Sequence, residues 1–348
     1  MKELKRKRNP ANISAADFFL ETEKLRPEFA KLINAKDPKR IVVVPSVSYG
    51  MATVAQNLRI DSSHNIIVAA EQFPSNVYSW LRIREEKKAE VKIISPPQLF
   101  SNRGKIWNER ILDAINTNTR LVALGNVHWT DGTKFDLITI RKRTREVGAL
   151  LVIDGSQSVG ALPFDVSKIQ PDALICAGYK WLLGPYSMGL AYYGDYFNNG
   201  RPLEEGWMNK KNSEDFTALV NYQDEYQPGA LRYEVGEHSH FIQMPMMISA
   251  LKQINQWKPE NIQSYCAKIT QEPIRLLQES GFLVEDEKFR GHHLFGVRLP
   301  ENVDLEKIKA RLKKNKISVS IRGNAIRVSP YLYNTENDLM KLVETLTR

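Results

Sequence analysis

Two short apolar runs constrain the fold of this chain more than any other feature of its sequence. The first run, LLVI at 150–153, ends on Asp154, and the second, DALICA at 172–177, continues into GYK, whose lysine is Lys180. Unbroken apolar runs of this length, bounded by glycine and proline, are typical of strands that are buried on both faces of a parallel sheet. We therefore predict that Asp154 and Lys180 follow the carboxyl ends of two strands, where open α/β sheets bind ligands.

A carboxylate and an amine that face one crevice suit a cofactor that carries both an aldehyde and a basic ring nitrogen. Pyridoxal 5′-phosphate (PLP) has both groups, because a lysine forms an imine with its aldehyde and a carboxylate keeps its pyridine nitrogen protonated. Each residue also has an ordinary interpretation when it is taken alone. A lysine after a strand is usually a solvated surface residue, and an aspartate at a strand end is often a helix cap.

The sequence of the whole segment 150–189 also resembles that of a known family. D-x-x-Q-x-x-G, followed by x-x-K-W-L-x-G-P and a closing glycine, resembles the PLP segment of the class V aminotransferases. That family includes cysteine desulfurases, kynureninase and isopenicillin N epimerase. The resemblance implies a PLP-dependent transferase of fold type I, an α/β fold. Such a fold has a large, mainly parallel, seven-stranded-type sheet sandwiched by helices, and a small C-terminal α/β domain.

The same resemblance assigns roles around the cofactor. Lys180 is the Schiff-base lysine and the base for the Cα proton, Asp154 is the partner of the pyridinium nitrogen, and Gln157 shares the cofactor's O3′ with Asn126. Phe73 replaces the histidine that stacks on the pyridine ring in many family members. The alternatives are that Asn126 is a turn former and that Phe73 belongs to the hydrophobic core.

The phosphate end of the site is expected after the strand RIVVVP at 40–45. We predict that Gly50 stands at a strand-to-helix turn and that the backbone N–H groups of Met51 and Ala52 bind the phosphate at the helix N-terminus. Ser48 or Thr53 would assist them. The alternative is an ordinary turn without a ligand.

Two further positions depart from the family pattern. Tyr179 stands where desulfurases carry a histidine, and its phenol is expected to donate to the phosphate. Glu237 replaces a threonine that reaches the phosphate of the neighbouring subunit, so Ser239 or His238 must take over that contact or it is lost. His128 is expected near the site, although a histidine at the rim or surface is the more common case.

The substrate side depends on the segment AIRVSPYLYNTENDL, which resembles the family's R-x-S…Y-N-T motif. The match makes Arg327 the residue that binds the substrate's α-carboxylate, through the paired hydrogen bonds that a guanidinium offers. Without the motif, Arg327 would read as an ordinary exposed strand residue. A persulfide-forming desulfurase also needs a cysteine shortly before this arginine, and Cys176 and Cys266 both stand elsewhere. We therefore expect no activity of that kind.

Composition narrows the class of protein. The 348 residues are 42% hydrophobic and 26% charged, and no apolar stretch approaches the roughly 20 residues of a membrane helix. The net charge of +9 comes largely from scattered lysines and arginines, so we expect no nucleic-acid partner and no membrane partner. We expect a cytoplasmic homodimer with its active site near the subunit interface, and no metal site.

The pattern of apolar residues predicts three parts. Spacing of three and four over 14–36 predicts a helix in an N-terminal segment, 1–36. A large PLP-binding domain follows at 37–257 and closes with a long helix at 241–257. Alternating helices and strands predict a small domain at 258–348 with a partly antiparallel sheet.

These observations predict a PLP-dependent enzyme that acts on an amino acid, with transamination as the leading reaction. A PLP-dependent lyase or epimerase is the alternative on the same scaffold. A non-catalytic protein of this fold is the third hypothesis, and the intact Lys180 and Asp154 argue against it.

Overall fold

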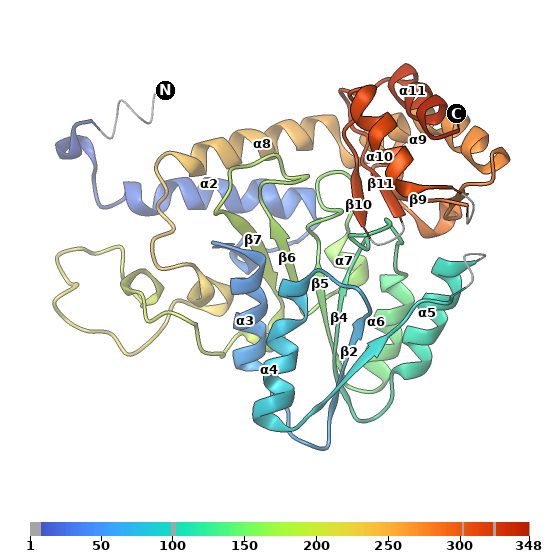
Figure 1. The fold of residues 1–348 in the computed structure, drawn as a ribbon. Helices are drawn as coiled ribbons and strands as arrows, with labels where there is room; N and C mark the ends of the chain where they lie inside the picture. The colour runs from blue at the N-terminus through green and yellow to red at the C-terminus, as the bar shows by residue number, and fades with distance from the viewer. Residues whose placement is uncertain (1–7, 99–101, 301–302, 323–324, 348) are drawn as a thin grey trace.

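Two β-sheets, one of seven strands and one of four, organise the chain. The computed structural model describes residues 8–98, 102–300, 303–322 and 325–347. Figure 1 shows the seven-stranded sheet between layers of helices, with the C-terminal part, coloured orange to red, gathered at one end of the molecule.

The seven-stranded sheet is mainly parallel. Its spatial order is β1-β7-β6-β5-β4-β2-β3, and β7 alone runs antiparallel to its neighbours. Both β5 and β6 are buried along their whole length, as their unbroken apolar runs predicted. The strands are β1 (Ile41–Val44), β2 (Asn65–Ala69), β3 (Glu90–Ile94), β4 (Thr119–Gly125), β5 (Leu150–Asp154), β6 (Ala173–Ala177) and β7 (Gly189–Tyr193).

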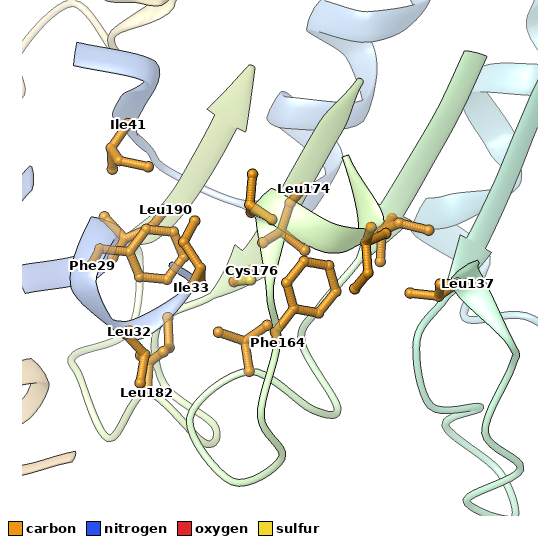
Figure 2. Packing of buried hydrophobic residues seen from close by; sticks show 14 of the residues in the cluster. Phe29, Leu32, Ile33, Ile41, Leu137, Phe164, Leu174, Cys176, Leu182 and Leu190 are labelled. Carbon is orange, nitrogen blue, oxygen red and sulfur yellow. The ribbon is translucent and has the colours of Figure 1, made fainter. Parts of the chain in front are cut away.

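Helices cover both faces of this sheet, because alternate strand side chains point to opposite faces and both sets are apolar. Figure 2 shows part of this packing: Leu190 of β7 lies beside Phe29 of the N-terminal helix, and Leu174 and Cys176 of β6 lie close to Phe164. One face is covered by α2 (Asp17–Leu32), α5 (Arg103–Ala114), α6 (Leu137–Glu146), α7 (Val166–Ile169) and α8 (Gln243–Trp257). The other face is covered by α3 (Val47–Asn57) and α4 (Tyr78–Lys87).

The four-stranded sheet is antiparallel throughout and has its own apolar core. Its order is β10-β11-β9-β8. The strands are β8 (Leu283–Val284), β9 (Phe295–Arg298), β10 (Ser320–Arg322) and β11 (Ala325–Val328). The helices are α9 (Pro259–Glu279), α10 (Leu305–Lys314) and α11 (Glu336–Thr347).

Short 3-10 helices connect several of these elements, and three of them lie in the segment between β7 and α8. They are η1 (Pro10–Asn12), η2 (Pro38–Arg40), η3 (Pro74–Asn76), η4 (Asp195–Phe197), η5 (Trp207–Asn209), η6 (Gly229–Tyr233) and η7 (Glu287–Phe289). None of the helices in the described part of the chain has the length and apolar composition that a bilayer crossing requires.

The N-terminal helix α2 is fixed to the large sheet by a buried charge pair. Arg26 contacts the carboxylate of Glu234 and donates to the carbonyl of Ile41 at 3.0 Å. The second oxygen of Glu234 accepts from the backbone N–H of Val43 at 2.6 Å. The fold class expected from the sequence is confirmed, and the boundaries of its parts remain a prediction.

Candidate active site

A cavity of about 290 Å³ opens at the carboxyl ends of the central strands. Asp154, the last residue of β5, and Lys180, three residues after β6, both line it. The residues between β6 and Lys180 turn sharply: Gly178 donates to the carbonyl of Met188 at 2.9 Å. A Cβ at Gly178 would lie 2.3 Å from that oxygen, so only glycine fits this turn. After this turn, the side chain of Lys180 lines the same cavity as Asp154.

The Asp154 carboxylate is held by donors on both of its oxygens. One oxygen accepts from the backbone N–H of Ser156 at 2.8 Å, and the other accepts from the side-chain amide of Asn76. All three residues are buried, and all three line the cavity. The amide oxygen of Asn76 has no hydrogen-bond partner among the described residues. These two hydrogen bonds hold the Asp154 carboxylate in one orientation in the cavity wall.

Lys180 has a lowered pKa, chiefly because burial disfavours its charged form. The Asp154 carboxylate partly opposes this effect, and the positive charge of Arg327 adds to it. The charges of both Asp154 and Arg327 therefore act on the Lys180 amine. Its nitrogen lies 5.5 Å from the centroid of the Phe73 ring, which places that ring over the same space.

The predicted phosphate site at Gly50, Met51 and Ala52 is wrong about where the helix begins. Helix α3 starts at Val47 with Ser46 as its N-cap, so these three residues lie inside the helix and the Gly50 N–H already donates to Ser46. The glycine has a packing role, since a Cβ there would lie 2.8 Å from a methyl carbon of Ile175 on β6. The strand pattern alone does not reveal so close a contact.

The helix N-terminus that faces the cavity is formed by residues 46–48. The N–H groups of Val47 and Ser48 are in the first turn, where an α-helix leaves its donors unpaired and its dipole attracts anions. The hydroxyls of Ser46 and Ser48 lie 2.9 Å apart beside them. Thr53 is directed away, because its hydroxyl donates to the carbonyl of Tyr49 at 3.1 Å.

The other residues expected near the cofactor lie in several positions. Phe73, Gln157 and Tyr179 line the cavity, and the Tyr179 ring is stacked on Tyr186 at 4.1 Å between centroids. Asn126 is buried at the end of β4, where its backbone N–H donates to the carbonyl of Asp154 at 3.2 Å. Its neighbours on both sides, but not Asn126 itself, belong to the cavity wall as described, so its role toward O3′ remains a prediction.

Two histidines have structural partners. His128 is buried and lines the cavity, near the site as expected, where it bonds Thr130 at 2.8 Å and donates to the carbonyl of Ala70 at 3.1 Å. His238 is buried against α2 and bonds the hydroxyl of Thr22 at 2.9 Å. Because His238 is engaged with α2, it is less suited than Ser239 to replace the family's threonine at the phosphate. Ser239 is partly accessible.

A second cavity of about 400 Å³ adjoins the first and shares Phe73, Trp129 and Lys180 with it. Its far wall is the small sheet, from which Arg327 of β11 and Arg322 of β10 line the space. Arg327 donates to the main-chain carbonyl of Trp129 at 2.8 Å. Burial, followed by the charge of Arg322, lowers the pKa of Arg327.

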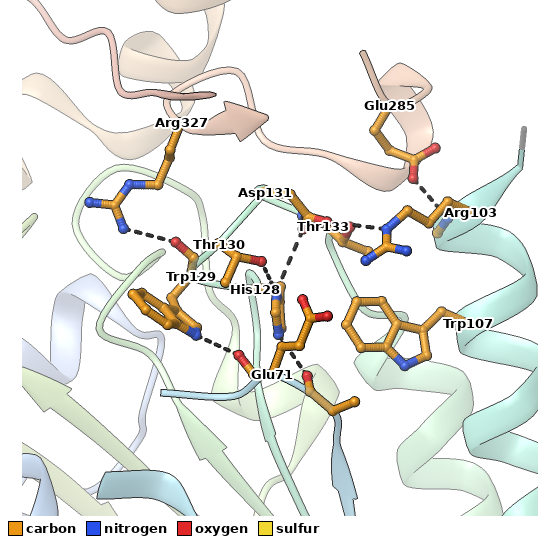
Figure 3. A network of polar contacts seen from close by, with 12 residues as sticks. Glu71, Arg103, Trp107, His128, Trp129, Thr130, Asp131, Thr133, Glu285 and Arg327 are labelled. Atoms are coloured by element: carbon orange, nitrogen blue, oxygen red, sulfur yellow. Dashed lines mark hydrogen bonds and ion pairs between the residues drawn. The ribbon is translucent and has the colours of Figure 1, made fainter. Parts of the chain in front are cut away.

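The segment after β4 carries that carbonyl, and a buried polar network fixes it (Figure 3). Asp131 bonds the N–H and hydroxyl of Thr133 and pairs with Arg103 of α5 and Arg298 of β9, both at 3.1 Å. Burial favours the neutral acid, but the contact with His128 and the charge of Arg103 hold the pKa of Asp131 well below its ordinary value. The network therefore joins the two sheets across the site.

Sequence reasoning missed several residues of the site: Ser46, Ser156, Trp129, Asp131 and Arg322. The signal for Ser46 was available, because a serine before an apolar-periodic run is an N-cap signature. Trp129 contributes through a carbonyl oxygen, which no residue pattern reveals.

Comparison with known proteins identifies the family of this chain. The chain belongs to the class-V aminotransferase family, whose model matches residues 13–342. An uncharacterized aminotransferase, YcbU, of Bacillus subtilis is 25% identical over 94% of this chain and 83% of its own length. The isopenicillin N epimerase of Streptomyces clavuligerus is 22% identical over 92% of this chain and 82% of its own length.

Solved structures share the fold. The cystine C-S lyase C-DES, in complex with its reaction product cysteine persulfide, superposes with a TM-score of 0.85 at 20% identity. The match covers 98% of this chain and 90% of that one. A C-DES variant with glycine covalently linked to the PLP cofactor gives a TM-score of 0.84, at 19% identity over 98% of this chain and 89% of that one.

The cofactor of this family is PLP, and the residues of the cavity fit it. A helix N-terminus with two serine hydroxyls suits the phosphate, and the Asp154 carboxylate suits a protonated ring nitrogen. The lysine between them has the lowered pKa that imine formation requires. The unpartnered amide oxygen of Asn76, beside Asp154, leaves one polar group of the wall free for a ligand.

Proposed function

We propose that this PLP-dependent enzyme transfers the amino group of an amino acid. One observation carries the proposal: Lys180 lines both the cavity that holds Asp154 and the adjoining cavity that holds Arg327. An amine that reaches both spaces stands between the cofactor and the substrate's carboxylate.

PLP, when bound, withdraws electrons from the substrate's Cα and so makes its proton acidic. Lys180 is the base for that proton, because burial lowers its pKa and thereby favours the uncharged amine. Asp154 keeps the opposite end of the cavity negative, which favours a protonated ring nitrogen. Arg327 binds the α-carboxylate and thereby orients the bonds at Cα.

A lyase or an epimerase on the same scaffold is the second candidate. The similarity to isopenicillin N epimerase over most of the chain favours it, and both reactions also begin with removal of the Cα proton. Cysteine-dependent persulfide formation is not supported, because Cys176 and Cys266 are both buried in apolar surroundings that raise the pKa of each thiol.

The test is a half-reaction on the purified protein reconstituted with PLP. Transamination converts the bound PLP to its amine form, which changes its absorbance and leaves a 2-oxo acid in solution. Epimerisation leaves the cofactor unchanged and inverts Cα, whereas elimination releases ammonia with the 2-oxo acid. If the protein neither binds PLP through Lys180 nor converts any amino acid, the proposal is wrong.

We also propose that the enzyme acts as a homodimer, as members of this family typically do. The exposed aromatic and aliphatic side chains of the segment between β7 and α8, among them Val220 and Tyr222, support a subunit contact there. Analytical ultracentrifugation at micromolar concentration measures the mass in solution. A mass near 39.9 kDa, that of one chain, would contradict the dimer.

A further inference from the structure

Two arginines share the substrate side of the site, and one α-carboxylate requires only one of them. Arg322 and Arg327 both line the 400 Å³ cavity. They stand on adjacent antiparallel strands, where Ser320 pairs with Arg327 and Ala325 pairs with Arg322. Side chains two residues apart on a strand share a face, so Arg322 and Arg327 are diagonal neighbours on the face toward the cavity, with Cα atoms roughly 7–8 Å apart.

Neither guanidinium has an anionic partner in the described part of the chain. Arg327 bonds the Trp129 carbonyl at 2.8 Å and the Ser320 hydroxyl at 3.5 Å, and Arg322 bonds only the adjacent carbonyl of Ile321 at 3.0 Å. The Nε of each arginine is buried and has no hydrogen-bond partner among the residues that the structure describes. The described lining of the cavity also contains Lys180 but no aspartate or glutamate.

Three other arginines with little exposure are matched by carboxylates, whereas the buried Arg290 donates to the main-chain carbonyl of Glu285. Arg26 pairs with Glu234, Arg103 with Asp131, and Arg141 with Asp172. Leaving a cationic group partly desolvated beside a like charge is unfavourable, and the charge of Arg322 does lower the pKa of Arg327. Two unmatched cations in one cavity therefore indicate that the missing anions arrive with the ligand.

Building on the proposed function, we propose that the substrate is an amino acid with a second oxyanion on its side chain, which Arg322 binds while Arg327 binds the α-carboxylate. The indole of Trp129 supports this arrangement, since the Arg322 guanidinium lies 5.2 Å from its ring centroid. The same residue thus positions both arginines, one through its carbonyl and the other through its ring. A carboxylate and a phosphate are the two side-chain groups that suit a guanidinium fork.

The first test measures kcat/KM of the holoenzyme for glutamate, aspartate and phosphoserine, with glutamine, asparagine and serine as uncharged counterparts. The anionic member of at least one pair should react about ten- to a hundredfold faster, which is the range for one charged hydrogen-bonded contact. Phosphoserine identifies a phosphate site, and glutamate or aspartate identifies a carboxylate site. Equal rates within all three pairs overturn the inference and leave amino-group transfer intact, whereas no conversion of any amino acid overturns the proposed function itself.

The second test asks whether Arg322 carries the preference. Arg322→Gln should bring the ratio within the preferred pair close to one, and Arg322→Lys should recover part of it. Arg82→Gln, a substitution of an exposed arginine on α4, is the matched control and should keep the wild-type ratio. A purely structural role for Arg322 would lower both rates of a pair together, and that result would overturn the assignment.

Binding without turnover gives an independent measurement. Glutarate carries two carboxylates and butyrate carries one, so calorimetry should show glutarate binding to the holoenzyme at least about tenfold more tightly. Arg322→Gln should remove that difference. Equal affinity of the wild-type holoenzyme for both acids would overturn the inference even if the enzyme transfers amino groups.

Discussion

The two walls of the active site differ in how their charges are satisfied. On the wall formed by the large sheet, Asp154 receives a hydrogen bond on each oxygen, and the first turn of α3 is capped by Ser46. On the wall formed by the small sheet, Arg322 and Arg327 have no carboxylate partner among the described residues. The protein itself supplies the hydrogen bonds to the Asp154 carboxylate on one wall, whereas the two arginines on the other wall leave their charges to be matched by a ligand.

This difference matches the residence times of the two ligands. A cofactor that stays through many turnovers requires a preorganised cavity, because reorganisation would cost free energy at every step. A substrate that enters and leaves gains most from charges that it alone neutralises, since protein carboxylates would compete with it. The four predictions below test this contrast, from the largest expected effect to the smallest.

Replacement of Lys180 should have the largest effect. Lys180→Ala removes both the covalent attachment and the base, so the half-reaction should slow by about 10³–10⁴-fold. Borohydride reduction with peptide mapping should label Lys180 in the wild type and lose that label in the variant. Lys142→Ala, which changes an exposed lysine of α6, is the control. A pyridoxyl label on another lysine of the wild type would contradict the assignment.

Asp154→Asn should keep PLP bound but slow the half-reaction by about 10²–10³-fold, because the anionic partner of the ring is lost. The fold should tolerate the change, since the free amide oxygen of Asn76 can accept from the new side-chain amide after a flip. Absorbance titration with PLP and single-turnover rates measure the two effects separately. Asp113→Asn, at an exposed carboxylate of α5, should change neither, and a wild-type rate for Asp154→Asn would exclude the role.

Arg327→Lys keeps the positive charge on the wall of the small sheet but loses the paired N–H donors of the guanidinium. We expect KM to rise and kcat to fall together, with a loss of about 1.5–3 kcal/mol, or one to two decades, in kcat/KM. The affinity for PLP should not change, because Arg327 lies outside the cofactor cavity as described. If Arg327→Ala converts amino acids at the wild-type efficiency, the substrate lacks a carboxylate bound in this way.

His293 lies where the two walls meet and should affect stability more than activity. Its Nε2 donates to the carbonyl of Gln157 at 2.7 Å, Gln263 donates to its Nδ1, and burial lowers its pKa from 6.5 to about 4. The unfolded chain therefore binds more protons than the folded chain between these values, so stability falls as the pH drops from 6.5 toward 4. Between pH 7 and pH 5 this residue alone should lower the free energy of unfolding by about 2 kcal/mol.

Urea unfolding of the wild type and of His293→Gln at pH 7 and pH 5 measures this difference. The variant should lose less stability than the wild type over the same interval, because its side chain does not titrate. His64→Gln, at a partly exposed histidine without a structural contact between the walls, is the matched control. Equal losses in wild type and His293→Gln would contradict the prediction.

The sequence was most informative on the wall of the large sheet. Buried strands have an apolar pattern that repeats over their whole length, so the positions of Asp154 and Lys180 follow from where the runs end. The start of α3 was misjudged because a glycine was taken for a turn, although contact with Ile175 demands it. The contacts of Arg322 and Trp129 depend on residues nearly 200 positions apart and on a main-chain oxygen, which no local pattern contains.

The buried pair of Arg26 and Glu234 has a consequence for synthesis on the ribosome. Arg26 belongs to the first long helix to emerge, and its partner follows 208 residues later. At about 5–20 residues per second, α2 waits roughly 10–40 s before Glu234 is synthesised, the buried one of the two carboxylates that contact Arg26. During that interval the apolar side of α2, including Leu25 and Phe29, also lacks the α8 helix against which it packs. The nascent chain therefore exposes apolar surface during that interval, and docking of α2 is expected to be a late step of folding.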